Sequence, residues 1–345
     1  MTLAVIIYVV LLFVAALTGV LLLMPRLLPK LRAMKFGQTI YELGPKHQQK
    51  QGTPNMGGIL IGAMTVLVTV IGFAWLCARD RMPYFSFDNP MWGLLFISFF
   101  SMLIGFADDY IKDAKKRHDG LSPKQKLVMQ LVVGILFSFY CRHLVGTAIL
   151  LPFTNKTWDL GFFYVPVMTV LVMFMTNSAN LQDGLDGLLS TVTALGMAAF
   201  GVFCYFLNSR AGLPMAVRPV ILTGCAALCG AVAGFLRFNR YPAKIFMGDT
   251  GSMFIGGMMV GVGMLSRCAF PMLLFCLTCV CSSLSVMIQV AYFKLTHGKR
   301  LFKMSPIHHH FELCGMKEPQ IVRMYAIVTA ISSAVAVLIM LGFLV

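Results

Sequence analysis

Residues 3–24 read LAVIIYVVLLFVAALTGVLLLM, an apolar run without a single charged side chain. A helix needs roughly 20 apolar residues to cross a bilayer, and this run is long enough. The hydrophobic part of a signal peptide is shorter, roughly 7–15 residues, and ends at a cleavage site of small residues. No such site follows here, so the run predicts a first membrane-spanning helix.

The same apolar character extends over the whole chain of 345 residues, of which 58% are hydrophobic and 12% are charged. Soluble domains carry about 25% charged residues, so this composition excludes a soluble globule, and its apolar content excludes a disordered chain. Apolar runs bounded by charge, Pro or Gly predict an all-α polytopic membrane protein with about ten transmembrane helices in a single domain, residues 1–345. The expected spans are 3–24, 56–78, 91–107, 125–145, 161–180, 186–207, 217–236, 251–267, 271–295 and 321–345.

Charge is distributed unequally between the two sides of this expected membrane domain. The loops that follow the odd-numbered spans hold 21 of the 28 Lys and Arg residues, and the other loops hold 7. Because basic residues concentrate in cytoplasmic loops, the first set is assigned to the cytoplasm and both termini to the periplasm. The net charge of +15 is then a feature of topology and requires no nucleic acid. Ten of the 13 acidic residues share the cytoplasmic side, which predicts an active-site cleft on that face.

Two adjacent acids, Asp108 and Asp109, follow the span 91–107. Adjacent carboxylates at the mouth of an apolar helix repel each other, and a divalent cation would relieve that repulsion. A helix C-terminus also disfavours negative charge, so stability alone does not explain the pair. The alternative is a pair of solvated acids balanced by Lys112 and Lys115.

A second polar cluster, TNSANLQDGLDG at residues 176–187, joins the fifth and sixth spans. Asp183 and Asp186 are three residues apart and share a face if the segment is helical. Gly184 and Gly187 allow the backbone to approach a ligand closely. A helix N-cap is the alternative role, but it accounts for only one of the two Asp residues.

A third cluster, FMGDTGS at residues 246–252, precedes the span 251–267. Free backbone N–H groups at a helix start suit a phosphate, and Asp249 beside them would need a metal ion or a proton to coexist with it. Phe246 could stack on a nucleobase. The alternative is a capped helix start with no ligand.

Two further clusters carry groups that could bind phosphate. The run His308–His310 cannot face one way on a helix or strand, so we expect a loop that turns two of the three imidazoles inward. Zinc, with Cys314, is the alternative, but no other ligand has a suitable spacing. Lys50 is a candidate phosphate binder, and nearby Thr53 or Asn55 could simply cap the next span.

The acidic clusters come from three separate loops on one side of the expected membrane. Together with the Lys and His residues, they supply carboxylates for a metal and donors for phosphates. The residues therefore favour a metal-dependent reaction between a phosphorylated cytoplasmic substrate and a component of the bilayer.

Three of these motifs resemble the polyprenyl-phosphate N-acetylhexosamine-1-phosphate transferase superfamily: residues 106–109 (FADD), 180–187 (NLQDGLDG) and 246–252 (FMGDTGS). Residues 306–312 (PIHHHFE) are similar to the segment that marks its phospho-N-acetylmuramoyl-pentapeptide-transferase (translocase I) branch. The resemblance covers essentially the whole chain, in the expected order. Two positions depart from the family pattern: Asn55 and Gln182 stand where Thr is usual, and both substitutes could hydrogen-bond.

The resemblance implies a bacterial inner-membrane enzyme of peptidoglycan synthesis, often a homodimer. It implies transfer of phospho-N-acetylmuramoyl-pentapeptide from its UDP carrier to undecaprenyl phosphate, which yields lipid I and UMP and requires Mg²⁺. By the same resemblance, Asp249 matches the metal-binding acid, Asp108 and Asp109 match an acid pair linked to metal and lipid-phosphate activation, and His308 joins these catalytic residues. The residues expected to bind substrate are Lys50, Asn177, Asp183, Gly184, Leu185, Asp186, Asn239, Phe246, Gln289, His309 and His310.

The expected mechanism is a single displacement in which the lipid phosphate, deprotonated by Asp108, attacks the sugar-linked phosphorus. A two-step route through a covalent phospho-Asp249 is the alternative. Two rival functions are the same chemistry on UDP-GlcNAc and, in another class, a transporter that does not transform its solute. The His308–His310 segment argues against the first, and the clustering of acids at helix ends, without an inverted repeat, argues against the second.

Overall fold

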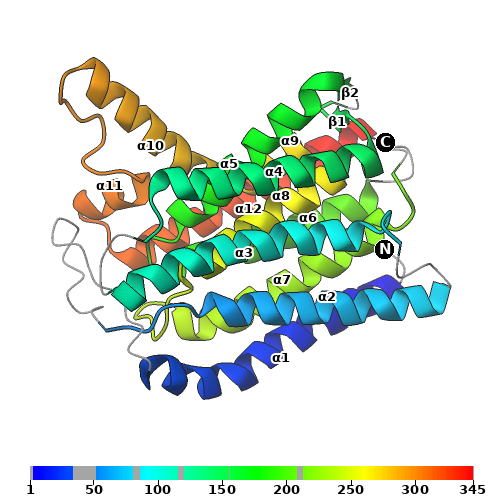
Figure 1. Ribbon diagram of the computed structural model, residues 1–345, viewed down its shortest axis with the longest axis horizontal. Coiled ribbons are helices and arrows are strands. Elements are labelled where there is room, and N and C mark those ends of the chain that lie inside the picture. Colours follow the sequence, from blue (N-terminus) through cyan, green and yellow to red (C-terminus); the bar gives the residue numbers. More distant parts are fainter. Residues whose placement is uncertain are drawn as a thin grey trace.

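The computed structural model describes residues 3–33, 52–80, 86–115, 120–154, 156–207 and 213–344. Over these residues the chain forms twelve α-helices, one short 3₁₀ helix and one two-stranded β-hairpin (Figure 1). The predicted all-helical architecture is confirmed, and the hairpin is an addition to it. The helices are α1 (Leu3–Ala33), α2 (Gly58–Asp80), α3 (Pro90–Lys115), α4 (Pro123–Val145), α5 (Tyr164–Gln182), α6 (Leu188–Phe206), α7 (Val217–Asn239), α8 (Gly248–Leu265), α9 (Ala269–Phe275), α10 (Leu277–Leu295), α11 (Ile307–Leu313) and α12 (Glu318–Leu344), and the hairpin consists of β1 (Ala148–Leu150) and β2 (Thr157–Asp159), followed by the 3₁₀ helix η2 (Gly161–Phe163).

Nine of the helices within the described residues are long and apolar enough to cross a membrane. The chain is therefore a multi-pass membrane protein. The eighth expected span, 251–267, forms α8, but glycines and Asp249 dilute its apolar content and it is not among the nine. The expected span 271–295 is divided into the short α9 and the longer α10, which meet at Cys276.

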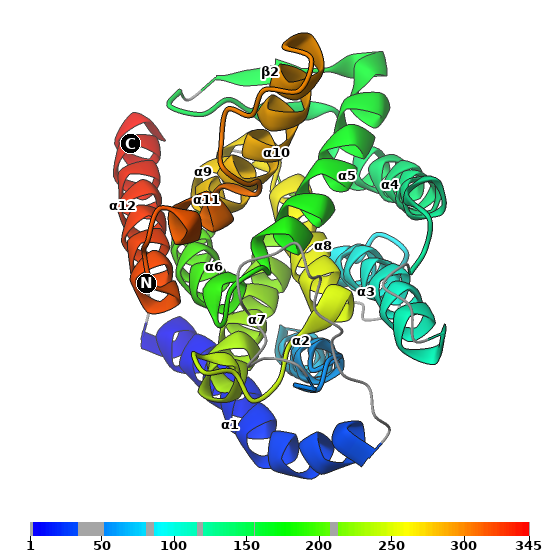
Figure 2. The same ribbon diagram turned by 90° about the vertical axis from the view of Figure 1, so that its left-hand side faces the viewer.

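Helix α1 extends beyond the predicted end of its span at Met24. It continues through Pro25 and Pro29 to Ala33, and Figure 2 shows that it bends along its length. A proline removes one backbone hydrogen bond and kinks a helix without necessarily ending it. The sequence prediction treated Pro25 as a terminator, which is why it placed the end too early.

Helix α8 lies at the centre of the bundle. Every residue from Thr250 to Leu265 is buried, and α8 packs against α2, α3, α5 and α9. Glycines make this possible: a Cβ on Gly256 would lie 2.7 Å from the Cα of Thr176, and one on Gly257 would lie 2.9 Å from the carbonyl oxygen of Ile97. Small residues let helix backbones approach closely, which is how membrane helices gain van der Waals contact.

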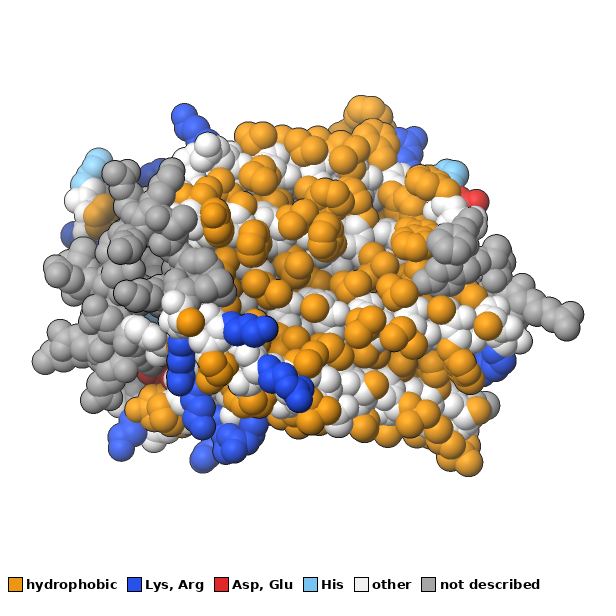
Figure 3. All heavy atoms as spheres, turned by 60° about the horizontal axis from the view of Figure 1, so that its bottom comes forward, with side chains coloured by type: hydrophobic (Ala, Val, Ile, Leu, Met, Phe, Trp, Pro, Cys, Tyr) orange, Lys and Arg blue, Asp and Glu red, His pale blue; other side chains and the backbone are white. Residues whose placement is uncertain are grey.

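The two ends of the bundle differ in composition. Figure 1 shows both chain termini at the same end, and α3 and α4 meet at the opposite end. Figure 3 shows hydrophobic side chains over the middle of one face, and Lys and Arg gathered near one end. The last turn of α1, for example, carries Lys30 and Arg32. An apolar middle with charged ends is the surface that a bilayer requires.

The hairpin was not predicted because its strands are only three residues long. Its register pairs Ala148 with Asp159 and Leu150 with Thr157. The backbone N–H of Leu150 donates to the carbonyl oxygen of Arg267 at 2.8 Å, and the Nε of Arg267 donates to the carbonyl oxygen of Val145. These bonds attach the hairpin to the turn between α8 and α9.

The contact between α2 and α8 gives a testable prediction. A Cβ on Gly58 would lie 2.2 Å from the backbone of Gly251, so Gly58→Ala must separate the two helices. We expect the free energy of unfolding to fall by about 1–3 kcal/mol, measured as a lower melting temperature of the detergent-purified protein. Gly62→Ala is the matched control one turn along α2, because its Cβ would be crowded only by the flexible side chain of Met102 and would lie at an ordinary contact distance, 3.5 Å, from Phe254. Equal melting temperatures for the two variants would contradict the prediction.

Candidate active site

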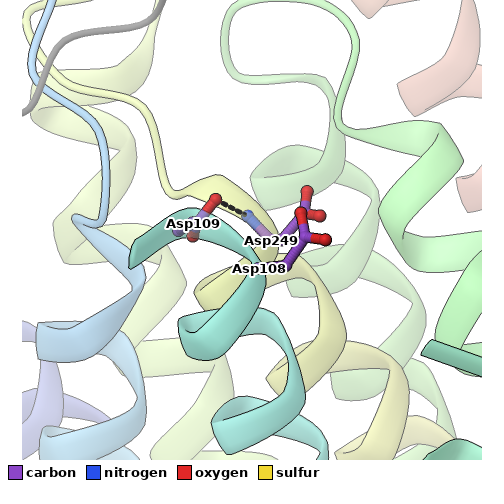
Figure 4. A group of neighbouring side chains, drawn as sticks. All are labelled: Asp108, Asp109 and Asp249. Atoms are coloured by element: carbon purple, nitrogen blue, oxygen red, sulfur yellow. Dashed lines mark hydrogen bonds between the residues drawn. The ribbon is translucent and has the colours of Figure 1, made fainter. Parts of the chain in front are cut away.

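The three acids that the sequence singled out lie together at one end of the bundle. Asp108 and Asp109 are in the last two turns of α3, and Asp249 is in the first turn of α8 (Figure 4). Carboxylate oxygens of the three lie within 4.8 Å of one another, and Asp108 and Asp109 are buried. A Cβ on Gly105 would lie 2.1 Å from the carbonyl oxygen of Asp249, so this glycine lets α3 reach the start of α8.

This group of donors fits a divalent cation. Carboxylate oxygens are the ligands that hard ions such as Mg²⁺ prefer. Asp108 and Asp249 would repel each other strongly at this separation in a buried setting without positive charge between them. The group could therefore hold a metal ion.

Two lysines supply positive charge to the same carboxylates. Lys112 Nζ lies 2.5 Å from Asp108 Oδ2 and 3.2 Å from Asp249 Oδ2, and Lys126 Nζ lies 2.9 Å from Asp249 Oδ2. Lys112 was expected only as a charge that balances a pair of solvated acids, and Lys126 was not expected at the site. Lys112 is four residues after Asp108, a spacing that places it on the same helix face, so this contact had a local signal. Lys126, at the start of α4, had none.

Asn180, at the end of α5, fixes the other oxygen of Asp249. Its Nδ2 donates to Asp249 Oδ1 at 2.7 Å and to the hydroxyl of Ser252 at 2.9 Å. The second and third sequence motifs therefore meet through direct hydrogen bonds. Asn180 was quoted within its motif but was not among the predicted site residues.

Asn239 and Asp186 hold the loops beside this centre. Asn239 Oδ1 accepts from the N–H of Gly187 at 3.1 Å, and its Nδ2 donates to the carbonyl oxygen of Ile245 at 3.0 Å. Asp186 Oδ2 accepts from the N–H of Ala243 at 2.9 Å. Both side chains are buried and bond to backbone, so here they shape the loops that follow α5 and α7.

Phe246 is held by backbone pairing with the segment that enters α2. Its N–H donates to the carbonyl oxygen of Pro54, and its own carbonyl oxygen accepts from the N–H of Gly57, both at 2.9 Å. Its side chain is partly buried. The predicted phosphate binder Lys50 lies outside the described residues, so its role stays a prediction.

The remaining predicted residues of α5 and its loop lie close to one another. Asn177 Nδ2 donates to Gln130 Oε1 at 2.9 Å, which links α5 to α4. Asp183 directly follows α5 and is partly buried, and Leu185 is buried. Burial, and the nearby charge of Asp249, raise the pKa of Asp183 well above its ordinary value.

The three consecutive histidines lie on the short helix α11, not on a loop as the sequence predicted. As expected, the three imidazoles do not all face one way. His308 is fully buried and faces Gly184, where an added Cβ would lie 2.2 Å from its Nε2. His309 Nδ1 lies 2.6 Å from Glu312 Oε2, and His310 Nδ1 accepts from the N–H of Lys303 at 3.1 Å.

Gln289 supports the loop that leads to α11. Its Oε1 accepts from the N–H groups of Leu301 and Phe302 at 3.1 and 2.9 Å, and its Nε2 donates to the carbonyl oxygen of Phe302. Nearby, Ser285 Oγ accepts from the N–H of Ile307 at 3.0 Å. The predicted substrate contact of Gln289 is untested by this geometry, but its polar atoms are already bonded to the loop.

Both departures from the family pattern make hydrogen bonds. Asn55 Nδ2 donates to Asp109 Oδ1 at 3.3 Å, and Ser282 Oγ donates to Gln182 Oε1. Asn55 therefore bonds to one of the three acids, and Gln182 joins the end of α5 to α10.

The buried His308 predicts a pH dependence of stability. Burial, with a smaller contribution from His309, lowers its pKa well below the ordinary value of 6.5. Below pH 6.5 the unfolded chain binds a proton that the folded chain excludes, so stability falls by about 1.4 kcal/mol for each pH unit until the folded pKa is reached. We expect the melting temperature to fall between pH 7.5 and pH 5.5, and to fall less in His308→Leu. An unchanged pH slope in His308→Leu would assign the dependence to other groups.

Comparison with known proteins identifies the family. The model of glycosyl transferase family 4 matches residues 91–267, which include all three acids. The chain is 43% identical to a phospho-N-acetylmuramoyl-pentapeptide-transferase of Thermoanaerobacter sp. strain X514 over 312 residues, 89% of this chain and 91% of the relative. The chain belongs to the phospho-N-acetylmuramoyl-pentapeptide-transferase family.

Two further members support this assignment over a greater length. The chain is 41% identical to the enzyme of the same name from Clostridium kluyveri over 336 residues, 96% of each chain. It is 39% identical to the one from Clostridium novyi strain NT over 323 residues, 93% of this chain and 91% of the relative. Similarity therefore extends across the bundle and well beyond the 91–267 segment. The family predicted from the sequence motifs is confirmed.

Proposed function

We propose that this chain transfers phospho-N-acetylmuramoyl-pentapeptide from UDP to undecaprenyl phosphate, forming lipid I and releasing UMP for peptidoglycan synthesis. The observation that carries this proposal is the identity of about 40% to phospho-N-acetylmuramoyl-pentapeptide-transferases over about nine-tenths of the chain. The buried group of Asp108, Asp109 and Asp249 supports it, because phosphoryl transfer needs concentrated positive charge held by carboxylates.

The charges of the site suit a pyrophosphate substrate. Mg²⁺, held by Asp249 and Asp108, would neutralise charge on the pyrophosphate. Lys112 and Lys126 contact the same carboxylates and could reach phosphate oxygens by small side-chain movements. Asp108 is our candidate to accept a proton from the lipid phosphate. Since the second pKa of a phosphate is near 6, a strong base is not required.

The nucleoside and sugar are assigned to the neighbouring loops. We assign Phe246 to stack on the uracil ring. The segment that leads to it is joined to the loop of residues 183–187 by the bonds of Asn239 and Asp186. His308–His310 on α11 and Lys50 are assigned to the phosphates and the peptide-bearing sugar. Membership of the family supports the choice of sugar, and the side chains of these loops supply the hydrogen-bond donors.

The charge bias favours one orientation in the membrane. With 21 of 28 basic residues on the side of the acid group, we place that side in the cytoplasm and both termini in the periplasm. A cytoplasmic site gives access to a water-soluble UDP-linked substrate, and the apolar flanks of the bundle give access to a lipid substrate. The family further favours a homodimer.

Release of UMP is the decisive measurement. Purified protein in detergent, with undecaprenyl phosphate and Mg²⁺, should release UMP from UDP-N-acetylmuramoyl-pentapeptide but not from UDP-GlcNAc, assayed side by side. Omission of the lipid phosphate, or addition of EDTA, should stop the release. Preference for UDP-GlcNAc would assign the chain to another sugar, and binding without turnover would favour a transporter.

The stereochemistry at phosphorus separates the two possible routes. A single displacement inverts a chirally labelled phosphorus, whereas two displacements through phospho-Asp249 retain its configuration. We expect inversion. Retention of configuration would exclude the single-step route and would require a covalent intermediate, for which Asp249 is the candidate nucleophile.

A further inference from the structure

The carboxylate of Asp109 is fully engaged by hydrogen bonds. Its Oδ2 accepts from the backbone N–H of Thr250 at 2.8 Å and from the Thr250 hydroxyl at 2.7 Å. Its Oδ1 accepts from the backbone N–H of Asp249 at 3.1 Å and from Asn55 Nδ2 at 3.3 Å. Its exposed fraction is 1%. Two donors to each oxygen use the acceptor capacity of a carboxylate.

Two of these donors, the backbone N–H groups of Asp249 and Thr250, lie in the first turn of α8 and have no acceptor within the helix. The first N–H groups of a helix have no partner within it, and the residue before α8, Met247, offers no capping side chain. Asp109, which belongs to α3, supplies the missing acceptor from outside the helix. Its negative charge also lies at the positive end of the α8 dipole, where it is favourable.

The backbone around α8 is built to admit this carboxylate. Gly248 has a φ of +72°, and a Cβ there would lie 2.5 Å from Asp109 Oδ2. Glycine at this position therefore provides both the conformation and the space for the cap. A carboxylate whose only role was to bind a cation would need neither the positive φ of Gly248 nor the space that its missing Cβ leaves.

The other two acids are arranged differently. Figure 4 shows the side chains of Asp108 and Asp249 next to each other, whereas Asp109 lies apart from them and is joined to the backbone of Asp249. The positive charges of the site follow that division, because Lys112 contacts Asp108 and Asp249, and Lys126 contacts Asp249.

We propose that Asp109 is a positioning residue that caps α8 and thereby sets the position of Asp249, and that the cation is bound by Asp108 and Asp249. A metal bond to Asp109 would require it to give up donors that have no other partner in α8, which is costly in a buried setting. The assignment rests on the proposed function only in taking Asp249 as a cation ligand.

Hydrogen exchange tests the cap directly. In Asp109→Asn, the amides of Asp249 and Thr250 should exchange about tenfold faster or more. The Asn side chain has one acceptor oxygen where the carboxylate has two, and it carries no negative charge. Asp159→Asn, the same substitution in the distant hairpin, is the matched control and should leave these amides unchanged. Unchanged exchange of the two amides in Asp109→Asn would overturn the proposal.

Binding of Mn²⁺, followed by electron paramagnetic resonance on the detergent-purified protein, tests the division of roles. Asp249→Asn should weaken Mn²⁺ binding by about 100-fold or more, and Asp109→Asn by about tenfold or less. Thr250→Val, which keeps all three carboxylates but removes one donor to Asp109, should shift Mn²⁺ affinity in the same direction as Asp109→Asn, and Thr250→Ser should restore it. Loss of Mn²⁺ binding in Asp109→Asn that equals the loss in Asp249→Asn would show that Asp109 is a ligand.

The exchange measurement also separates this inference from the proposed function. If the wild-type protein bound no Mn²⁺ and released no UMP, the metal chemistry of the proposed function would fail. Fast exchange at Asp249 and Thr250 in Asp109→Asn would then still establish the cap.

Discussion

Asp249→Asn should reduce the rate of UMP release by about 10³-fold, which corresponds to roughly 4 kcal/mol of lost charge stabilisation. The substitution keeps the shape of the side chain and removes its charge. Asn180 and the two lysines Lys112 and Lys126 all bond to this one carboxylate, so the change leaves two ammonium groups close together without their shared partner. The cation would lose a ligand at the same time. Initial rates over a range of Mg²⁺ concentrations measure the effect.

Folding must be intact for this result to bear on the site. The melting temperature and helical circular dichroism of Asp249→Asn should remain close to those of the wild type, because Asp109 still caps α8. Asp159→Asn, which lies on the hairpin at the other end of the bundle, should retain full activity. If Asp249→Asn kept both full activity and its metal affinity, Asp249 would not belong to the reaction centre.

The membrane spans were predictable because bilayer thickness imposes a length on every apolar run. Two of the predicted spans were wrong in part, and each error has a physical cause that the pattern of apolar residues does not show. Pro25 reads as a terminator, but the helix passes through it as a bend. The run 251–267 reads as an ordinary span, but its glycines serve contact with protein on all sides, so α8 is more buried than its neighbours and is not among the nine candidate spans.

The site was predictable as a set of motifs but not as a set of contacts. The motifs that contain Asp108, Asn180 and Asp249 were expected to converge, and they do. Lys126 was missed because its contact with Asp249 depends on how α4 packs beside α8, and no spacing in the sequence encodes that. The sequence also assigned Asp109 and Asp108 to one acid pair, because they are adjacent in the chain. Adjacent residues on a helix point in different directions, and here they make different contacts.

The contact between Gly184 and His308 gives a second prediction with a large effect. A Cβ on Gly184 would lie 2.2 Å from His308 Nε2 and 3.1 Å from two ring carbons, so Gly184→Ala and the imidazole cannot occupy their present positions together. His308 is fully buried, so its ring cannot turn out into solvent to relieve the contact. We expect Gly184→Ala to lower the free energy of unfolding by about 1–3 kcal/mol and the rate of UMP release by about 100-fold.

A double-mutant cycle separates this contact from an independent role of Gly184. His308→Ala removes the ring, so adding Gly184→Ala to it should cost little further stability and little further activity. The two substitutions should be non-additive by about 1–2 kcal/mol in the free energy of unfolding. Additive effects on stability would mean that the alanine methyl group does not meet His308. In that case α11 would not pack on the loop of residues 183–187 as described, and the proposed assignment of the histidines to the substrate phosphates would lose its support.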